Sequence, residues 1–348
     1  MLEPPALPDE TIIASVRASY GLAVAALTFL PIGNDSSTWV YRLQAANRGV
    51  YFLKLRKGAA NEPSFAVPRY LSDHGVTHVV AALPTAAGTL WVDVDGFALA
   101  LYPFIDGTTG TDARMAERHW ITYGATLRQI HGTALPLEIA RHMRRETFTP
   151  DGSAVVKRLD THLAARPVRS FTDPSERELA AFWHDRRDEL RTLVDRAKLL
   201  GRQLRATSPP LVLCHADFHT WNVLIDTADR LWIVDWDETV LAPRERDLMF
   251  VVGGLSADLV GPRKEAWFFA GYGATTVDPL ALAYYRYAWA LSDIGDYGER
   301  VFSRPGMGGE TKRAAVQGAM SCFQPGRIVA LAYEADRLQA DPRTTRHS

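Results

Sequence analysis

The sequence predicts an α+β protein with two lobes, a small β-rich N-terminal lobe at 1–102 and a larger, mostly helical lobe at 108–340. Two observations predict this architecture. Short apolar runs punctuated by turn residues come first, whereas long segments with helical periodicity follow. In addition, 348 residues are long for a single core, which favours two lobes sharing a cleft. We expect the hinge at 103–107 and a disordered polar tail at 341–348.

The N-terminal lobe is expected to be an antiparallel sheet with one or two helices. A first helix is predicted from Asp9, which can act as its cap, to Tyr20, with Gly21 as its stop. Asp95-Gly96 is a two-residue turn of the kind that joins hairpin strands. The other predicted elements are three strands at 25–32, 39–44 and 50–55, a helix within 64–74, and the hairpin strands 90–94 and 97–102.

The C-terminal lobe is expected to be built from helices around a short motif segment of strands and loops. A helix at 114–131 places Trp120, Tyr123, Leu127 and Ile130 on one face. Further helices are predicted at 174–204, as one helix or a pair, and at 246–252, 263–272, 279–302 and 311–338.

Composition excludes several classes of partner. The formal net charge is -1, which gives no overall attraction to nucleic acid or to an anionic membrane. No run is long and apolar enough to span a bilayer, and the N-terminus does not resemble a signal peptide. Two cysteines do not suggest a disulfide framework. We therefore expect a cytoplasmic protein without nucleic-acid or membrane partners; the oligomeric state is left open.

The chemistry is concentrated in a His215-x-Asp217-x-x-x-x-Asn222 loop that lies between two apolar runs, with Asp235 at the end of the second run. This pattern suits phosphoryl transfer. Asp217 can act as the base that orients an attacking hydroxyl, while Asn222 and Asp235 can hold Mg²⁺ on the nucleotide phosphates. Taken singly, Asp217 also fits a turn cap and Asp235 an ion pair with an arginine.

Lys54 supports the same interpretation from a distant part of the chain. It is a cation on an otherwise apolar predicted strand, and the α- and β-phosphates of a nucleotide would supply its anion. Glu62 is the predicted carboxylate partner of Lys54, although Pro63 and Pro68 fit poorly in the interior of the helix that should carry it. The alternative is an edge-strand lysine that reaches water.

Two further segments are candidate nucleotide contacts. In the turn at 33–38, backbone N–H groups and the hydroxyls of Ser36 and Ser37 can contact phosphate, although an ordinary hairpin turn fits nearly as well. In the hinge, the Pro103 carbonyl can accept from a purine and the Ile105 N–H can donate to it; a plain extended linker is the alternative. ATP is the expected nucleotide, with GTP left open.

The two histidines of the motif raise a rival hypothesis. His215, Asp217 and His219 also resemble the ligand set of a zinc hydrolase, but Asn222 has no role in such a site. We expect His215 to be a structural histidine that braces the loop through the backbone, and His219 to be a loop or substrate-side residue. Cys214 lies in an apolar run, where core packing is favoured over a nucleophile.

With these residues in view, the chain resembles the aminoglycoside phosphotransferase family, which has the bilobal protein-kinase-like fold. The resemblance runs from about Ile12 to Tyr333 and implies Asp217 as base, Asn222 and Asp235 as magnesium ligands and Lys54 as phosphate anchor. The loop at 33–38 and the proline-containing Glu62 segment depart from the kinase pattern. The segments that carry the resemblance are 51–55, 100–105, 127–131, 212–219, 233–238, 241–250, 271–273 and 284–286.

The resemblance also implies a small-molecule antibiotic as substrate. It is strongest toward members that phosphorylate spectinomycin, and such a modification would confer resistance. A cationic acceptor favours carboxylates and aromatic faces, so Asp237, Glu238, His219 and Asp293 are candidate substrate residues. Kinases of choline, homoserine or small sugars, and a nucleotide-binding pseudokinase, are the alternatives on the same scaffold.

Overall fold

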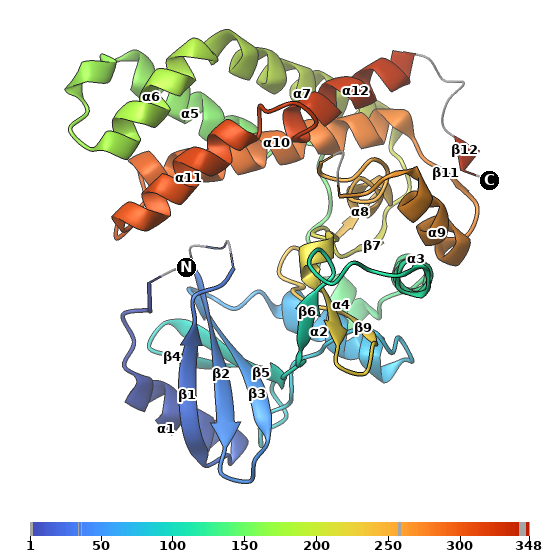
Figure 1. Cartoon of the computed structure of the whole chain (residues 1–348). Coiled ribbons are helices and arrows are strands. Elements are labelled where there is room, and N and C mark those ends of the chain that lie inside the picture. Colours follow the sequence, from blue (N-terminus) through green and yellow to red (C-terminus); the bar gives the residue numbers. More distant parts are fainter. Residues whose placement is uncertain (1–2, 34, 36, 257–258, 341–345, 348) are drawn as a thin grey trace. The chain divides into compact units, whose positions relative to one another are not determined.

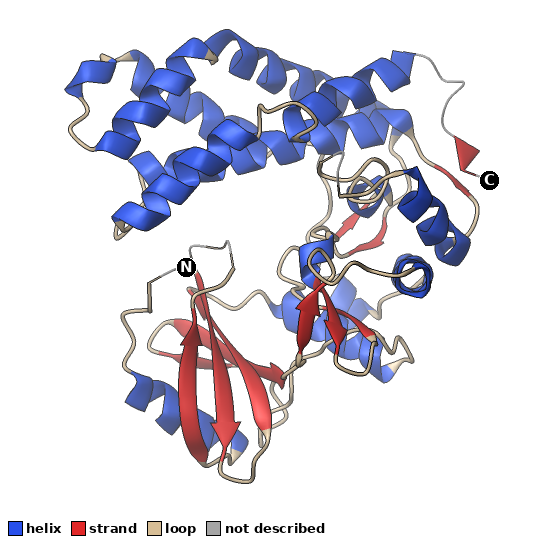
Figure 2. Ribbon diagram, viewed as in Figure 1, coloured by secondary structure: helices blue, strands red, loops and turns tan. Residues whose placement is uncertain are grey.

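The protein has an α+β fold, seen in a computed structural model that describes residues 3–33, 35, 37–256, 259–340 and 346–347 (Figures 1 and 2). The chain divides into two compact units. The first comprises Met1–Arg144 and His215–Val240, and the second comprises Arg145–Cys214 and Leu241–Ser348. The division into lobes at 103–107 stays a prediction.

The first unit contains a five-stranded antiparallel sheet with the strand order β1-β2-β3-β5-β4. The three predicted strands and the predicted hairpin are confirmed. Asp95 and Gly96 have φ angles of 50° and 79°, as a two-residue turn between antiparallel strands requires. The strands are β1 (Val24–Leu30), β2 (Thr38–Ala45), β3 (Val50–Lys57), β4 (Val92–Val94) and β5 (Phe97–Pro103).

Helix α1 (Asp9–Tyr20) contributes Ile12 and Val16 to the hydrophobic core of this sheet. Gly21 ends the helix in the left-handed region, at φ 65°, as predicted. The prediction that Asp9 caps the helix was wrong. Pro8 occupies the N-cap position, and Asp9 is the first helical residue, where its negative charge still favours the positive end of the helix dipole.

The rest of the described part of the first unit comprises α-helices, a short 3-10 helix at Thr220–Asn222 and a small sheet. Pro63 lies in the first turn of α2, where a missing N–H costs nothing, whereas Pro68 lies inside that helix. Helix α3 begins at Glu117 rather than Arg114, because Arg114 has φ 47° and cannot continue a right-handed helix. The elements are α2 (Glu62–Asp73), α3 (Glu117–His131), α4 (Leu137–Ala140) and the antiparallel strands β6 (Gly107–Thr109), β8 (Val223–Asp226) and β9 (Leu231–Ile233).

The second unit is mostly helical. Its helices are α5 (Gly152–Ala164), α6 (Pro174–Asp185), α7 (Arg187–Thr207), α8 (Glu245–Leu248), α9 (Pro262–Tyr272), α10 (Pro279–Phe302), α11 (Gly309–Ser321) and α12 (Ile328–Ala340). Its short strands pair as β7 (Val212–Cys214) with β10 (Val240–Ala242) and β11 (Thr275–Thr276) with β12 (Arg346–His347).

Some predicted boundaries in this unit differ from the structure. The segment at 174–204 is a pair of helices separated at Arg186, and the segment at 311–338 is interrupted before Ile328 by Pro325-Gly326. Helix α5 was not predicted. Within the tail predicted to be disordered, Arg346–His347 form β12, and the rest of 341–348 lies outside the described residues.

Helix α10 is the centre of the second unit. It packs against α5, α7, α11 and α12. Tyr284, Tyr285 and Tyr287 on this helix are almost fully buried, which is the usual meaning of an aromatic stripe at helical spacing. Asp296, on the same helix, pairs with Arg300 and Arg304.

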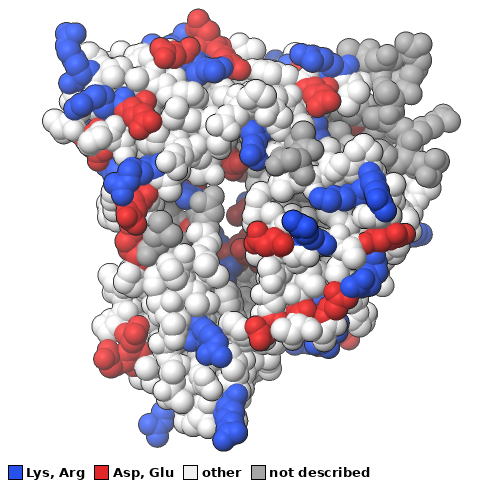
Figure 3. Space-filling view, viewed as in Figure 1, with Lys and Arg blue, Asp and Glu red and all other residues white. Residues whose placement is uncertain are grey.

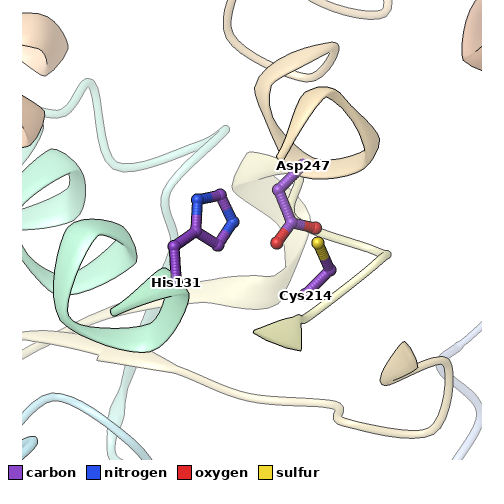
Figure 4. Close-up of side chains that lie close together, drawn as sticks. All are labelled: His131, Cys214 and Asp247. Atoms are coloured by element: carbon purple, nitrogen blue, oxygen red, sulfur yellow. The ribbon is translucent and has the colours of Figure 1, made fainter. Parts of the chain in front are cut away.

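Cys214 and Asp247 lie side by side in the interior of the second unit, within 4.8 Å of one another (Figure 4). Burial and the negative charge of Asp247 raise the pKa of the Cys214 thiol well above its usual range. The thiol therefore stays protonated, and the residue fills the core, as predicted, instead of acting as a nucleophile.

Basic and acidic side chains are interspersed over the face of the molecule seen in Figure 3. Within the part of the chain that the structure describes, no helix combines the length and the apolar character needed to cross a membrane.

We predict that Gly152→Ala destabilises the protein. Gly152 is the first residue of α5, and a Cβ atom there would overlap the backbone of Leu291 and Ser292 in α10. Relieving this overlap requires the backbones of α5 and α10 to move apart, which disrupts their packing. We therefore expect a loss of about 1 to 3 kcal/mol in the free energy of unfolding. Urea denaturation followed by circular dichroism measures it.

Gly309→Ala is the matched control, because Gly309 is also the first residue of a 13-residue helix, α11. A Cβ atom there meets only the end of the Arg313 side chain, at 3.6 Å. We expect its stability to equal or slightly exceed that of the wild type. Equal stability of the two variants would contradict the close approach of α5 and α10.

Candidate active site

Asn222 and Asp235 lie at the same end of a β-hairpin in the first unit. Asn222 directly precedes β8, and Asp235 follows β9 after one intervening residue, Val234. The strands are antiparallel, with Val223 opposite Ile233, and the Val234 N–H donates to the Asn222 carbonyl at 3.0 Å. Antiparallel pairing therefore brings the two predicted magnesium ligands to one end of the hairpin.

His215 is fully buried and supports the loop that carries Asp217. Its Nε2 lies 3.0 Å from the Val234 carbonyl, and its Nδ1 lies 3.3 Å from the backbone nitrogen of Asp217. Because a backbone N–H can only donate, Nδ1 is the acceptor and Nε2 carries the proton. The ring thus connects the backbone at Asp217 to the segment that leads to Asp235, which is the structural role we expected.

A stacked aromatic pair supports the same loop from α3. The ring of Tyr123 lies parallel to that of Phe218, with 4.2 Å between centroids. The Tyr123 hydroxyl donates to the Phe218 carbonyl at 2.6 Å. Both side chains are buried, so the backbone next to Asp217 is held by packing as well as by hydrogen bonds.

The carboxylate of Asp217 is held on both of its oxygens. Asn222 Nδ2 donates to Oδ2 at 2.7 Å, and His219 Nε2 lies 3.1 Å from Oδ1. Burial raises the pKa of Asp217. The charge of His219 and the hydrogen bonds from His219 and Asn222 lower it by more than burial raises it, so that the pKa is about 2. Asp217 is therefore ionised at neutral pH. Burial lowers the pKa of His219, and Asp217 raises it to above its ordinary value.

Lys54, on β3, contacts two carboxylates of the segment that follows β9. Its Nζ lies 2.8 Å from Asp235 Oδ1 and 2.9 Å from Asp237 Oδ2. Burial lowers the pKa of Lys54, but the two carboxylates raise it well above its usual range. The lysine side chain is 12% exposed and stays charged. It does not reach into open water, so the edge-strand alternative does not describe it.

Glu62 is not the partner of Lys54 in this structure. It begins α2, and its carboxylate lies 3.9 Å from His142 Nδ1. Among the described residues, the carboxylates paired with Lys54 are those of Asp235 and Asp237. A role for Glu62 at the nucleotide stays a prediction.

The turn between β1 and β2 is organised by Asp35. Its Oδ1 accepts from the Ser37 N–H at 2.8 Å and from the Ser37 hydroxyl at 2.7 Å, and its Oδ2 accepts from the Thr38 hydroxyl at 2.7 Å. Burial raises the pKa of Asp35, but these bonds and the charge of Arg56 lower it to below its usual value. Ser36 lies outside the described residues. Phosphate contacts of Ser36 and Ser37 stay predictions.

The predicted adenine contacts lie at the end of the large sheet. Pro103 is the exposed last residue of β5, opposite Tyr51 of β3, and Ile105 follows in the loop before β6. Their carbonyl and N–H roles stay predictions.

The four predicted substrate residues lie in different surroundings. Asp237 contacts Lys54, and His219 contacts Asp217. Glu238 pairs with Arg144 at 2.8 Å. Asp293 lies on α10 in the second unit and is half-buried. Their roles in acceptor binding stay predictions.

Sequence reasoning missed Arg56 and Asn61. Arg56 Nη1 lies 2.6 Å from Asp237 Oδ2, and Asn61 Nδ2 donates to the Asp237 carbonyl at 3.0 Å. Strand alternation carried a signal for Arg56, because residues two apart on β3 share a face with Lys54. No local signal pointed to Asn61, which the fold brings to Asp237 from 176 positions away.

The geometry disfavours the zinc-hydrolase hypothesis. A zinc-bound histidine uses a nitrogen lone pair, but His215 Nδ1 accepts from the Asp217 N–H and Nε2 donates to Val234. His219 is instead directed at the Asp217 carboxylate. The three residues therefore do not converge as a ligand set.

A magnesium ion fits the donors that remain. The amide nitrogen of Asn222 is used on Asp217, which leaves its oxygen for a cation. The Asp235 side chain is 44% exposed, and its backbone is in the left-handed region, at φ 63°. Carboxylate and amide oxygens are the hard ligands that Mg²⁺ prefers.

The chain shares its kinase-like fold with solved structures of phosphotransferases. The solved structure of spectinomycin phosphotransferase APH(9)-Ia in complex with ADP and spectinomycin is 28% identical, with a TM-score of 0.84, and the match covers 96% of this chain and 100% of that one. Its AMP-bound complex is 26% identical, with a TM-score of 0.77 and coverage of 93% and 98%. Protein StrN of Streptomyces griseus is 25% identical over 293 residues, 81% of each protein.

The match to a family extends over most of the chain. The model of the phosphotransferase enzyme family matches residues 28–286. This range contains Lys54, Asp217, Asn222 and Asp235, the residues on which the sequence resemblance was based. The chain therefore belongs to the phosphotransferase enzyme family, as that resemblance predicted.

Proposed function

We propose that the protein is an ATP- and magnesium-dependent O-phosphotransferase that modifies a hydroxyl of an aminocyclitol or aminoglycoside antibiotic, with spectinomycin as the acceptor. Its expected place is the cytoplasm, where ATP is available, and its expected effect is resistance to that antibiotic. GTP stays an alternative phosphoryl donor.

One observation carries the proposal. Within a single compact unit, the fold joins an ionised, hydrogen-bonded Asp217 to Asn222, and joins Asp235 to Lys54. An ionised carboxylate, an amide oxygen, a second carboxylate and a buried lysine are the groups that phosphoryl transfer from a nucleotide uses. No part of this set is contributed by the second unit.

The proposed reaction is a direct, in-line transfer. The acceptor hydroxyl oxygen forms a bond to the γ-phosphorus, the bond from that phosphorus to the oxygen of ADP breaks, and the hydroxyl proton passes to Asp217. A carboxylate with a pKa of about 2 is a weak base. Its main contribution is therefore to orient the hydroxyl, and it takes the proton late, as the hydroxyl becomes acidic on bonding to phosphorus.

Asn222 and Asp235 would hold the magnesium ion. When bound, the ion neutralises phosphate charge and fixes the phosphates for transfer. Lys54 would exchange part of its contact with the two carboxylates for hydrogen bonds to the nucleotide phosphates. Its pKa is raised by those carboxylates, and phosphate oxygens would keep it protonated in the same way.

Similarity supports spectinomycin as the acceptor. The spectinomycin phosphotransferase complex with ADP and spectinomycin matches this chain over 96% of its length. Amicoumacin kinase hAmiN and a choline kinase, LicA, have related folds but are only 16% identical, with TM-scores of 0.61 and 0.55. They support the fold alone, so choline, homoserine and sugar acceptors are the alternatives. A pseudokinase is disfavoured because the four motif residues are all present.

We predict that Asp217→Asn lowers kcat by about 10²- to 10⁴-fold, the usual contribution of a general base. An amide cannot take the hydroxyl proton, whereas nucleotide affinity should change little because Lys54 and Asp235 are retained. Steady-state kinetics and ATP binding, measured on the same sample, separate the two effects.

Asp73→Asn is the matched control, because Asp73 pairs only at the surface with Arg69 of the same helix. It should keep wild-type kinetics. Full turnover by Asp217→Asn would remove Asp217 from the role of base, although it would leave the fold assignment intact.

We predict that Mg-ATP and spectinomycin together release ADP, whereas choline, homoserine, hygromycin and a 2-deoxystreptamine aminoglycoside do not. A coupled assay of ADP release measures all five acceptors in one series. Turnover with choline or homoserine instead would replace the antibiotic by a metabolic acceptor. If no acceptor reacts while ATP still binds, the pseudokinase alternative gains support.

A further inference from the structure

One carboxylate oxygen in the first unit lies between two cations. Asp237 Oδ2 is 2.9 Å from Lys54 Nζ and 2.6 Å from Arg56 Nη1. Lys54 and Arg56 are two residues apart on β3, so their side chains leave the same face of the strand. A single oxygen that accepts from an ammonium and a guanidinium group has the surroundings of a phosphate oxygen in a binding site.

The backbone of Asp237 is held independently of its carboxylate. Asn61, the residue that precedes α2, donates from Nδ2 to the Asp237 carbonyl at 3.0 Å. The Thr239 N–H donates to the Trp236 carbonyl at 3.2 Å. The side chain of Asp237 can therefore turn away from the two cations without unfolding the segment that carries it.

Of the carboxylates around these cations, that of Asp237 is the one to be exchanged. Asp35 is held by the hydroxyls of Ser37 and Thr38 and by a backbone N–H. Asp235 is a proposed ligand of the magnesium ion. Asp235 contacts Lys54 at 2.8 Å, whereas Asp237 Oδ2 contacts both Lys54 and Arg56. A group with more negative charge, such as a phosphate, would compete for the same position.

We infer that Lys54 and Arg56 together form a seat for one phosphate group of the nucleotide, and that the Asp237 carboxylate fills this seat until the nucleotide displaces it. The inference rests on the proposed function and adds to it a second phosphate-binding residue, Arg56, and an internal competitor, Asp237. The class of ligand is a nucleoside diphosphate or triphosphate, recognised through its phosphate oxygens.

The test is calorimetric titration of ADP and of adenosine into the wild type, Arg56→Gln, Asp237→Asn and the double variant, in buffer with EDTA so that metal does not contribute. Removing one charge-assisted hydrogen bond to phosphate should weaken ADP binding by Arg56→Gln about tenfold or more. Adenosine, which has no phosphate, should bind all four proteins equally. Asp237→Asn should bind ADP more tightly than the wild type, because the competing anion is gone.

Lys57→Gln is the matched control. Lys57 is the next residue of β3, exposed and directed to the opposite face, so the variant loses the same charge at nearly the same position. Its ADP affinity should equal that of the wild type. If Arg56→Gln and Lys57→Gln behave alike, Arg56 does not contact phosphate.

The double variant separates a phosphate contact from an indirect effect. If Arg56 binds phosphate, Arg56→Gln should weaken ADP binding in the Asp237→Asn background as well. An effect that vanishes there would overturn the inference, because Arg56 would then act only by anchoring Asp237. Loss of all ADP binding by the wild type in EDTA, with binding restored by magnesium, would also overturn it. A wild type that binds ADP in neither buffer would instead contradict the proposed function.

Discussion

The ammonium group of Lys54 lies against the carboxylates of Asp235 and Asp237, and Lys54 and Asp235 are 181 positions apart in the chain. A buried lysine loses its hydration, so it must find anions or lose its proton. The two carboxylates supply those anions. They thereby connect β3 of the large sheet to the end of β9, where strand pairing also places Asn222, the other proposed magnesium ligand.

The rest of the candidate site is built to hold this end of the hairpin in place. His215 links two backbone segments, Tyr123 packs on Phe218, and Asn222 donates to the Asp217 carboxylate. Each of these side chains is fixed by a backbone group or by close packing. Asp217 is consequently presented in a single orientation, as a group that must align a hydroxyl requires. A phosphoryl-transfer site depends more on such alignment than on the basicity of its carboxylate.

The features of the fold that could be predicted are those that local sequence determines. Helix α10 was predicted with its observed bounds, because Asp278 and Pro279 mark its start and its apolar face is continuous. The turn at Asp95-Gly96 was equally clear. The break at Arg186 carries no proline or glycine, so local sequence could not reveal it. Asp9 was wrongly predicted to be the cap. Pro8 occupies the N-cap position with extended backbone, and the helix begins at Asp9.

The site shows the same distinction. The residue types and spacing of Asp217, Asn222 and Asp235 were sufficient to identify a candidate base and two candidate magnesium ligands, since the spacing itself reflects the chemistry. The contacts between distant site residues were not predictable. The contact of Lys54 with Asp237, for example, depends on how distant strands pair. Glu62 was the expected partner on the kinase pattern, and in this structure a different pair of carboxylates takes that place.

The most direct test of the account is the uptake of Mn²⁺, as a paramagnetic substitute for Mg²⁺, by the protein in the presence of ATP. Electron paramagnetic resonance reports the bound ion without any need to know the acceptor. We expect the wild type to bind Mn²⁺ together with ATP and Asp235→Asn to lose that binding, because the variant removes the charged ligand. Equal Mn²⁺ binding by both proteins, or none by the wild type with ATP, would contradict the assignment of this site to magnesium-dependent phosphoryl transfer.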